Sequence, residues 1–306
     1  MLHLYSSSHE SRLFIGVAGW AYPEWQNLLG VASEPRPHAV LAILCELFNL
    51  VEITSSYYHP PDARTAKAWL EAAPSGRPFY FTMRLWNKLV RERTLLLQND
   101  IRLMKAGLSP VHEAGKLGAV IVPVLSTMHY SESNELWLLG LLDTFAEFPL
   151  VVENLHPSWF KSDTLLRLQD RNIGVVELDK QNETNYGGTP KLSPKRVVYL
   201  RCRGRYDNIS SNSFAERDTR VDYVYSETEI AKLALKLKNA LPYLATGFVV
   251  FNNHPRGNAL ANALELEFAL SSERLNPPQA LLQSFPALQK LTPALLKQRD
   301  LFEERI

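Results

Sequence analysis

The chain contains little cysteine, no long apolar run and almost no net charge. Its two cysteines, Cys45 and Cys202, lie far apart and show no Cys-x-x-Cys or Cys/His spacing of the kind that binds zinc. No run of about 18 apolar residues occurs, and the N-terminal residues lack a basic segment followed by an apolar one. The sequence therefore predicts neither a membrane-spanning helix nor export, and we expect a cytoplasmic protein with reduced thiols.

The charges of the chain nearly cancel. Its 33 Lys and Arg residues stand against 32 Asp and Glu residues, which gives a formal net charge of +1. A protein that binds membrane surfaces or nucleic acid nonspecifically usually carries a large basic excess. We therefore expect no membrane partner, and any preference for an anionic ligand must come from a local group of residues.

Short apolar runs of strand length alternate with longer helical patterns along most of the chain. This alternation is typical of a parallel sheet whose strands are joined by helices, and eight repeats predict an α/β fold of the (β/α)8 TIM-barrel type. The predicted strands are Leu13–Ala18, Leu50–Thr54, Phe79–Arg84, Gly118–Pro123, Leu150–Asn154, Gly174–Leu178, Val197–Arg201 and Gly247–Asn252.

Helical patterns fill most of the intervals between these strands. The predicted helices are Ala39–Phe48, Asp62–Ala72, Ile101–Ala114, Asn134–Phe148, Asp163–Arg171, Glu227–Leu241 and Asn258–Leu270. Ser226 with Glu229 forms a capping-box pattern, and Ser162 or Asp163 can cap the helix that follows.

No Pro/Gly-rich linker divides the chain, so one domain is predicted. We expect an N-terminal lead-in over residues 1–12, the barrel over residues 13–275 and a C-terminal helical extension over residues 276–306. Thr292 and Pro293 suit the start of a last helix, from Pro293 to about Glu304. Its expected role is to cover part of the barrel, with an oligomer contact as the alternative.

Charged and amide residues occur late in the predicted strands. Barrel strands are covered on both faces, so a charge within them is costly unless it is paired. The carboxyl ends of the strands meet at one mouth, where active sites of this fold lie. The residues concerned are Glu52, Arg84, Glu153, Asn154, Asp179, Arg201, Asn252 and Asn253. They predict either a polar ligand site or a structural ion-pair network at that mouth.

Aromatic residues and further arginines flank these strand ends. Trp20 and Tyr22 follow the first strand, and Tyr58 follows the second; such rings either stack on a ligand or plug the barrel. Arg203 and Arg205 follow Arg201 closely and can grip a phosphate or carboxylate, or can be solvated surface charges.

Several motifs resemble those of the YecE-like family, known as domain of unknown function 72, along roughly residues 13–270. They are Gly19-Trp20-Ala21-Tyr22-Pro23-Glu24-Trp25, Phe48 to Ile53 leading to Tyr57-Tyr58, Lys116-Leu117-Gly118, Glu153 with His156-Pro157-Ser158-Trp159, Tyr199 and Arg201 with Gly204-Arg205, Asp222 to Ser226, and Phe251-Asn252-Asn253 with Ala259 and Asn262-Ala263. The resemblance implies a TIM barrel of no established activity, similar in architecture to apurinic-endonuclease and sugar-isomerase barrels.

The leading functional hypothesis is a hydrolase-type enzyme that acts on a phosphate-bearing or carbohydrate-like substrate at the barrel mouth. Glu52, Glu153 and Asp179 are the candidate catalytic carboxylates, as a general base and its supporting groups. The candidate substrate-binding residues are Trp20, Tyr22, Tyr58, Arg84, Asn154, His156, Arg201, Arg203, Asn252 and Asn253.

No cofactor is clearly indicated, and no metal ligands are assigned. His156 and His254, both on loops, are too few for a zinc cluster, whereas a divalent cation such as magnesium held by carboxylates leaves little trace in a sequence. The alternative function is a noncatalytic binder of nucleic acid or of an anionic metabolite. A structural alternative assigns the apolar helix Leu136–Phe148 to a contact between subunits, although its pattern also fits packing on the barrel.

Overall fold

Eight parallel strands form a closed barrel in chain order, with β8 paired to β1. The computed structural model describes residues 12–31, 38–93, 98–161, 163–179, 197–204, 222–273 and 275–292. The strands are β1 (Arg12–Ala18), β2 (Leu50–Ile53), β3 (Tyr80–Arg84), β4 (Leu117–Pro123), β5 (Leu150–Glu153), β6 (Gly174–Leu178), β7 (Val197–Cys202) and β8 (Thr246–Phe251). The predicted (β/α)8 TIM barrel is confirmed, with strand ends within one or two residues of those expected.

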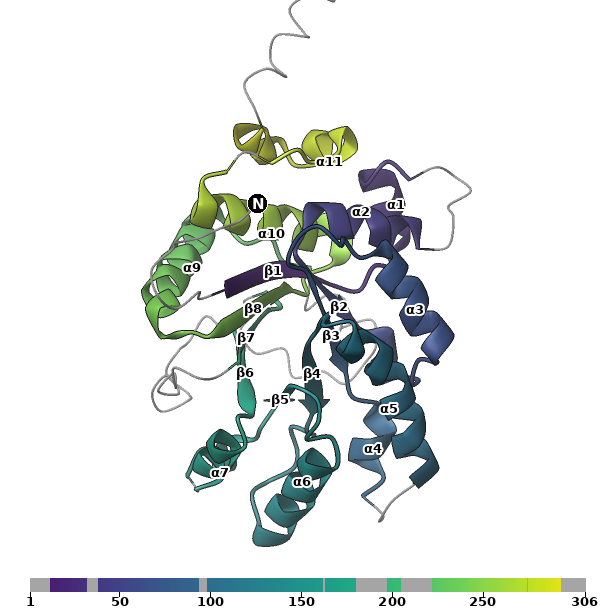
Figure 1. Ribbon diagram of the computed structural model, residues 1–306. Coiled ribbons are helices and arrows are strands. Elements are labelled where there is room, and N and C mark those ends of the chain that lie inside the picture. Colours follow the sequence, from purple (N-terminus) through teal and green to yellow (C-terminus); the bar gives the residue numbers. More distant parts are fainter. Residues whose placement is uncertain are drawn as a thin grey trace, which may run out of the picture.

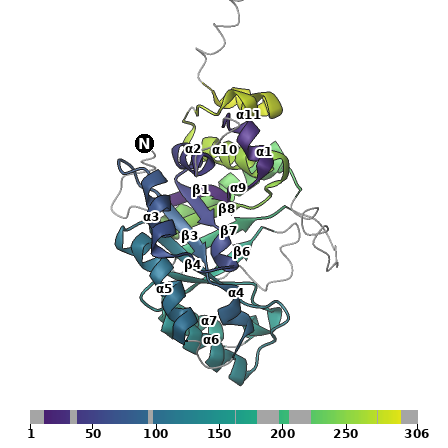
Figure 2. The ribbon, with the colours of Figure 1, turned by 90° about the vertical axis from the view of Figure 1, so that its right-hand side faces the viewer.

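Helices surround the barrel (Figures 1 and 2). The α-helices are α1 (Pro23–Leu28), α2 (Ala39–Leu47), α3 (Ala63–Ala72), α4 (Asn87–Arg91), α5 (Gln98–Glu113), α6 (Glu132–Thr144), α7 (Thr164–Asp170), α9 (Glu227–Ala240), α10 (Asn258–Ser271) and α11 (Gln279–Ser284). All seven helices predicted before residue 276 are present. The additional helices α1, α4 and α11 are too short to show an apolar period of 3.6 residues. The predicted helix Pro293–Glu304 lies outside the described residues.

The two predicted helix starts differ in their capping. Ser226 and Glu229 form the expected reciprocal capping box at the start of α9. Asp163 occupies the N-cap position of α7, but its side chain makes no capping hydrogen bond. Its ψ of 3° departs from the extended backbone that aims a capping side chain at the first turn. Asp62 has that extended backbone, with a ψ of 166°, and its side chain accepts a hydrogen bond from Thr65 N.

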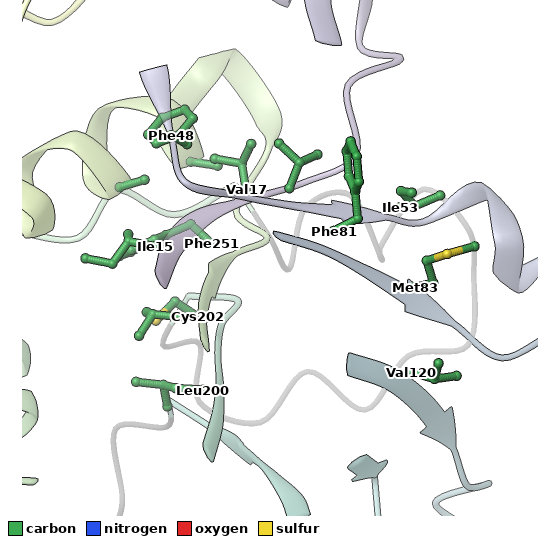
Figure 3. Close-up of a cluster of buried hydrophobic side chains, with 14 of the residues drawn as sticks. Ile15, Val17, Phe48, Ile53, Phe81, Met83, Val120, Leu200, Cys202 and Phe251 are labelled. Atoms are coloured by element: carbon green, nitrogen blue, oxygen red, sulfur yellow. The ribbon is translucent and has the colours of Figure 1, made fainter. Parts of the chain in front are cut away.

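Alternate residues of each strand enter two different apolar clusters, because successive side chains point to opposite faces of a sheet. The larger cluster lies between the strands and the helices, and Figure 3 shows part of it, including Ile15, Phe81 and Leu200. The smaller cluster fills the barrel interior. Its buried members are Phe14, Ala18, Leu50, Ala119, Ile121, Val151, Val176, Tyr199, Phe248 and Val250. Polar residues two positions beyond some of these interior residues therefore enter the barrel mouth.

The segment after the barrel packs back onto its helices. In Figure 1, α11 lies beside α10 and α1, and Leu281, Leu288 and Leu291 of this segment are fully buried. The described part of the extension therefore covers helices on one side of the barrel. Within the described part of the chain, no helix is both long and apolar enough to cross a membrane.

Candidate functional site

Two buried glutamates and a buried arginine lie at the carboxyl ends of three different strands. Glu52 on β2, Glu153 on β5 and Arg201 on β7 each stand two residues after a member of the interior cluster, namely Leu50, Val151 and Tyr199. The alternation of a strand therefore directs all three charged side chains toward the barrel axis. Strands that are distant in sequence thus bring these charges together at the mouth.

Arg201 joins the two carboxylates. Its Nη2 donates to Glu52 Oε2, and its Nε lies 2.7 Å from Glu153 Oε1. Two further guanidiniums reach Glu153: Arg84 Nη2 is 2.6 Å from Oε2, and Arg203 Nη2 is 2.8 Å from Oε1. Arg84 Nη1 also lies 3.7 Å from Glu52 Oε1. We call these five residues the arginine–glutamate cluster.

The cluster has a buried base and a partly exposed edge. The side chains of Glu52 and Glu153 are 0% exposed and that of Arg201 is 1% exposed, whereas Arg84 is 13% and Arg203 is 35% exposed. Three guanidiniums against two carboxylates leave an excess of one positive charge within the cluster. Arg84 and Arg203 are therefore the members that a ligand can reach from solvent.

The arginines hold Glu153 in its ionised form. Burial alone raises the pKa of a carboxylic acid. Here Arg201, Arg84 and Arg203 outweigh burial and keep the pKa of Glu153 well below its usual value. The effect is mutual, since Glu153 and Glu52 overcome the burial of Arg201 and raise its pKa. Burial and the neighbouring guanidiniums of Arg201 and Arg84 lower the pKa of Arg203, although Glu153 opposes this shift.

Glu52 also accepts a hydrogen bond from Tyr199. The Tyr199 hydroxyl donates to Glu52 Oε2 and lies 3.1 Å from Thr82 Oγ1. Burial and the adjacent Glu52 raise the pKa of Tyr199 well above its ordinary value, which keeps the phenol protonated. Glu52 Oε1 and Arg201 Nη1 are buried without a hydrogen-bond partner in the described structure. A buried polar atom without a hydrogen bond is costly, so these two atoms are unsatisfied positions within the cluster.

Aromatic side chains line the mouth beside the cluster. The guanidinium of Arg84 lies over the Tyr57 ring, 5.1 Å from its centroid, and Tyr57 packs edge to face against Tyr58 at 5.1 Å. Tyr22 stacks on His254 with a centroid distance of 4.2 Å and donates its hydroxyl to Ala18 O. Tyr22 thus contacts the ends of β1 and β8, and Tyr58 contacts the ring that carries Arg84.

The ring of His156 is fixed in its orientation. The backbone N–H of Ser158 donates to His156 Nδ1, and the Ser158 hydroxyl lies 2.9 Å from the same nitrogen. Since Nδ1 accepts a hydrogen bond, the neutral ring carries its proton on Nε2. His129 packs on this ring at 3.9 Å. His156 thus presents an Nε2–H donor on the loop after β5.

Other predicted site residues have different surroundings. The amide of Asn253 is fully buried and donates to Tyr223 O and to Asn262 on α10. Asp179 makes a side-chain hydrogen bond with Tyr225, and its backbone N–H donates to Arg201 O. Trp20 packs against Trp69 of α3.

Two more predicted residues lie at strand ends. Asn154 has a left-handed backbone with φ of 66°, an uncommon conformation that asparagine tolerates. The backbone N–H of Asn252 donates to Cys202 O. These residues border the mouth, but the ion pairs of the cluster do not include them.

The described residues contain no group of three or more His, Cys, Asp or Glu side chains suited to a metal ion. The buried carboxylates of the mouth, Glu52 and Glu153, bind guanidiniums. The cluster therefore does not support a magnesium site at these two carboxylates.

Three supporting residues are absent from the predicted site, namely Tyr199, Tyr57 and Ser56. Ser56 Oγ accepts the backbone N–H of Arg84 and donates to Ile53 O, so it ties the end of β3 to that of β2. Tyr199 could have been found from the sequence, because it lies two residues before Arg201 on the same strand and therefore points to the same face of the barrel. Nothing local marks Ser56.

The geometry defines this chain as a TIM barrel with a charged site at its carboxyl-terminal mouth. The model of the family described as "Protein of unknown function DUF72" matches residues 14–287, and the chain belongs to this family. The predicted resemblance is therefore confirmed.

Relatives agree with this assignment. The UPF0759 protein YunF of Bacillus subtilis is 19% identical over 83% of this chain and 93% of its own length. A DUF72 family protein of Enterococcus faecalis has a TM-score of 0.71 and 24% identity, covering 87% of this chain and 99% of that one. A DUF72 family protein of Thermotoga maritima has a TM-score of 0.67 and 23% identity, with coverages of 85% and 99%. At these identities the structures support the fold.

Proposed function

We propose that the barrel mouth binds the anionic group of a phosphate-bearing small molecule and that the protein is a hydrolase acting on it. The observation that carries the proposal is the arginine–glutamate cluster, in which Arg84 and Arg203 form the edge accessible to solvent. Guanidiniums present paired N–H donors that match the oxygens of phosphate. An uncharged carbohydrate would leave the excess positive charge uncompensated, so the cluster favours the phosphate-bearing class.

Glu153 serves in this proposal as a positioning residue. It contacts all three arginines and stays ionised, because they depress its pKa. A carboxylate with so low a pKa is a weak proton acceptor at neutral pH. Its contribution is to hold Arg84 and Arg203 in place before the ligand arrives, which reduces the entropy lost on binding.

Binding of inorganic phosphate and methyl phosphate to Arg203→Gln tests the first part of the proposal. Calorimetric titration of the full chain at low salt should show about tenfold or more weaker binding, since a hydrogen bond to a charged group contributes roughly 1.5–3 kcal/mol. Arg171→Gln is the matched control, because Arg171 pairs with Asp143 on the exposed surface of α7 and α6. Equal losses in both variants, or none in either, would refute a ligand contact of Arg203.

Glu52 is the candidate general base. Its Oε1 lacks a hydrogen bond and lies 3.7 Å from Arg84 Nη1. A bound anion that draws the Arg84 guanidinium toward itself would expose this oxygen to a water molecule. Glu52→Gln should therefore lower the turnover of a hydrolysable phosphate ester by about 100-fold, within the range for general acid–base catalysis, while phosphate binding persists.

The alternative function is a noncatalytic binder of nucleic acid or of an anionic metabolite. The same cluster would then recognise the anion without turnover. Tight phosphate binding together with no hydrolysis of phosphate monoesters or diesters would favour this alternative. Binding of single-stranded DNA that weakens steeply with salt would identify its nucleic-acid form.

A further inference from the structure

An exposed tyrosine stands beside the cluster. Tyr58 directly follows the short 3-10 helix η1 (Ser55–Tyr57) after β2, and 59% of its surface is exposed. A single exposed ring is ordinary on a protein surface. Tyr58 differs because its neighbour Tyr57 carries the guanidinium of Arg84 on its ring.

The contacts from Arg84 to Tyr58 are continuous. Arg84 lies 5.1 Å from the Tyr57 centroid, and the Tyr57 and Tyr58 centroids are 5.1 Å apart with an interplanar angle of 88°. Only the Tyr57 ring therefore lies between the Arg84 guanidinium and the exposed Tyr58 ring. This separation lies within the reach of one small molecule that carries both a charge and a ring.

Tyr58 also interacts electrostatically with Tyr22. Burial, then Glu52, Glu24 and Tyr58, raise the pKa of the Tyr22 hydroxyl, which places Tyr22 within electrostatic range of both Glu52 and Tyr58. Gly19 has a φ of +74°, and a side chain there would meet the Tyr22 hydroxyl at 2.9 Å and Thr54 Oγ1 at 3.0 Å. The Tyr22 hydroxyl therefore lies at the end of β2, from which the segment carrying Tyr58 begins.

We infer that the ligand carries a planar ring next to its anionic group, and that Tyr58 stacks on this ring while Arg84 and Arg203 bind the anion. The inference rests on the proposed function and specifies the substrate class of the same site. Aromatic side chains stack favourably on flat π-systems. The edge-to-face contact with Tyr57 already restricts the rotamers of Tyr58, so stacking of a ligand ring on Tyr58 costs little further side-chain entropy.

Phenyl phosphate and methyl phosphate provide a matched pair of probes, since both are monoesters with the same ionising group. The wild-type chain should bind phenyl phosphate about fivefold or more tightly than methyl phosphate, the lower limit for one stacking contact. Tyr58→Ala should abolish this preference, so that the ratio of the two affinities falls to about one. Tyr58→Phe, which keeps the ring, should retain the preference.

The outcomes separate the two proposals. Equal binding of both esters by the wild-type chain, or a preference that survives in Tyr58→Ala, would overturn the planar-ring inference and leave anion binding intact. A loss of methyl phosphate binding in Tyr58→Ala would likewise contradict a role confined to the ring. If neither ester binds, anion recognition itself fails and the inference falls with it.

Discussion

Arg201 Nε lies 2.7 Å from Glu153 Oε1, and the side chains of both residues are almost completely shielded from solvent. This ion pair sits where β5 and β7 reach the barrel mouth, with Arg84 and Arg203 on its outer side. A buried charge pair is weak evidence for net stability, but the removal of one partner is strongly destabilising. The cluster therefore couples the stability of the barrel to the candidate site at its mouth.

Glu153→Gln should destabilise the protein by about 3–5 kcal/mol at pH 7, because three guanidiniums lose their shared carboxylate. Urea denaturation followed by circular dichroism measures the change. Glu147→Gln is the control: Glu147 is 46% exposed in its pair with Lys105 and should contribute less than about 1 kcal/mol. If Glu153→Gln lowered the free energy of unfolding by no more than Glu147→Gln does, the ion-pair geometry would be contradicted.

The contribution of Glu153 should also depend on pH. Its pKa in the folded state is depressed below that of the unfolded chain, so its stabilising effect is complete above the unfolded pKa of about 4.3 and is lost as the pH falls toward the folded pKa. The difference in unfolding free energy between wild type and Glu153→Gln should be constant from pH 6 to 8 and shrink below about pH 4. If the difference in unfolding free energy between wild type and Glu153→Gln instead grew as the pH fell, the depressed pKa of Glu153 would be contradicted.

Tyr199→Phe should cost roughly 1–3 kcal/mol of unfolding free energy, because Glu52 Oε2 loses a buried donor. Tyr80→Phe provides a matched comparison. Tyr80 packs against Phe14 and Phe248 in the barrel, and its hydroxyl makes no hydrogen bond within the described residues, so its loss should have little effect. Thermal denaturation of the two variants measures the difference. Equal decreases in Tm for Tyr199→Phe and Tyr80→Phe would contradict a stabilising hydrogen bond from the Tyr199 hydroxyl.

Glu267 on α10 should show the opposite pH dependence to Glu153. Burial raises the pKa of Glu267 to about 7, so the folded state binds a proton more tightly than the unfolded chain. Stability should then fall as the pH rises from about 4 to 7, by roughly 3 kcal/mol for such a shift. Glu267→Gln should remove this decline, whereas Glu113→Gln, at an exposed position at the end of α5, should keep it. Denaturation curves at pH 4, 6 and 8 test the prediction.

The fold could be predicted because its signals are local. Parallel barrel strands are covered on both faces, and they appear in the sequence as short apolar runs separated by helical periods. The strand ends agreed within one or two residues for the same reason. The short helices α1, α4 and α11 gave no such signal, since their five or six residues do not complete two turns.

The candidate site could be predicted in part. The late charges in the strands indicated Glu52, Arg84, Glu153 and Arg201, and the structure joins these with Arg203 in the cluster. The same signal also selected residues outside the cluster, such as Asp179 and Asn253. The alternation of strand side chains distinguishes these two residues from the cluster. Residues on one face of a strand are an even number of positions apart, but Asp179 lies three residues after the interior residue Val176, and Asn253 lies three residues after the interior residue Val250.

By itself, the sequence determined the order of strands and helices and which strand ends carry charge, because these properties depend on neighbouring residues along the chain. The tertiary structure alone decided which charges pair. Glu52 and Arg201 belong to strands that are not neighbours in the barrel, and their contact arises from closure of the sheet. It also decided that Glu153 is neutralised by three arginines, since no local pattern encodes a distance across a closed barrel.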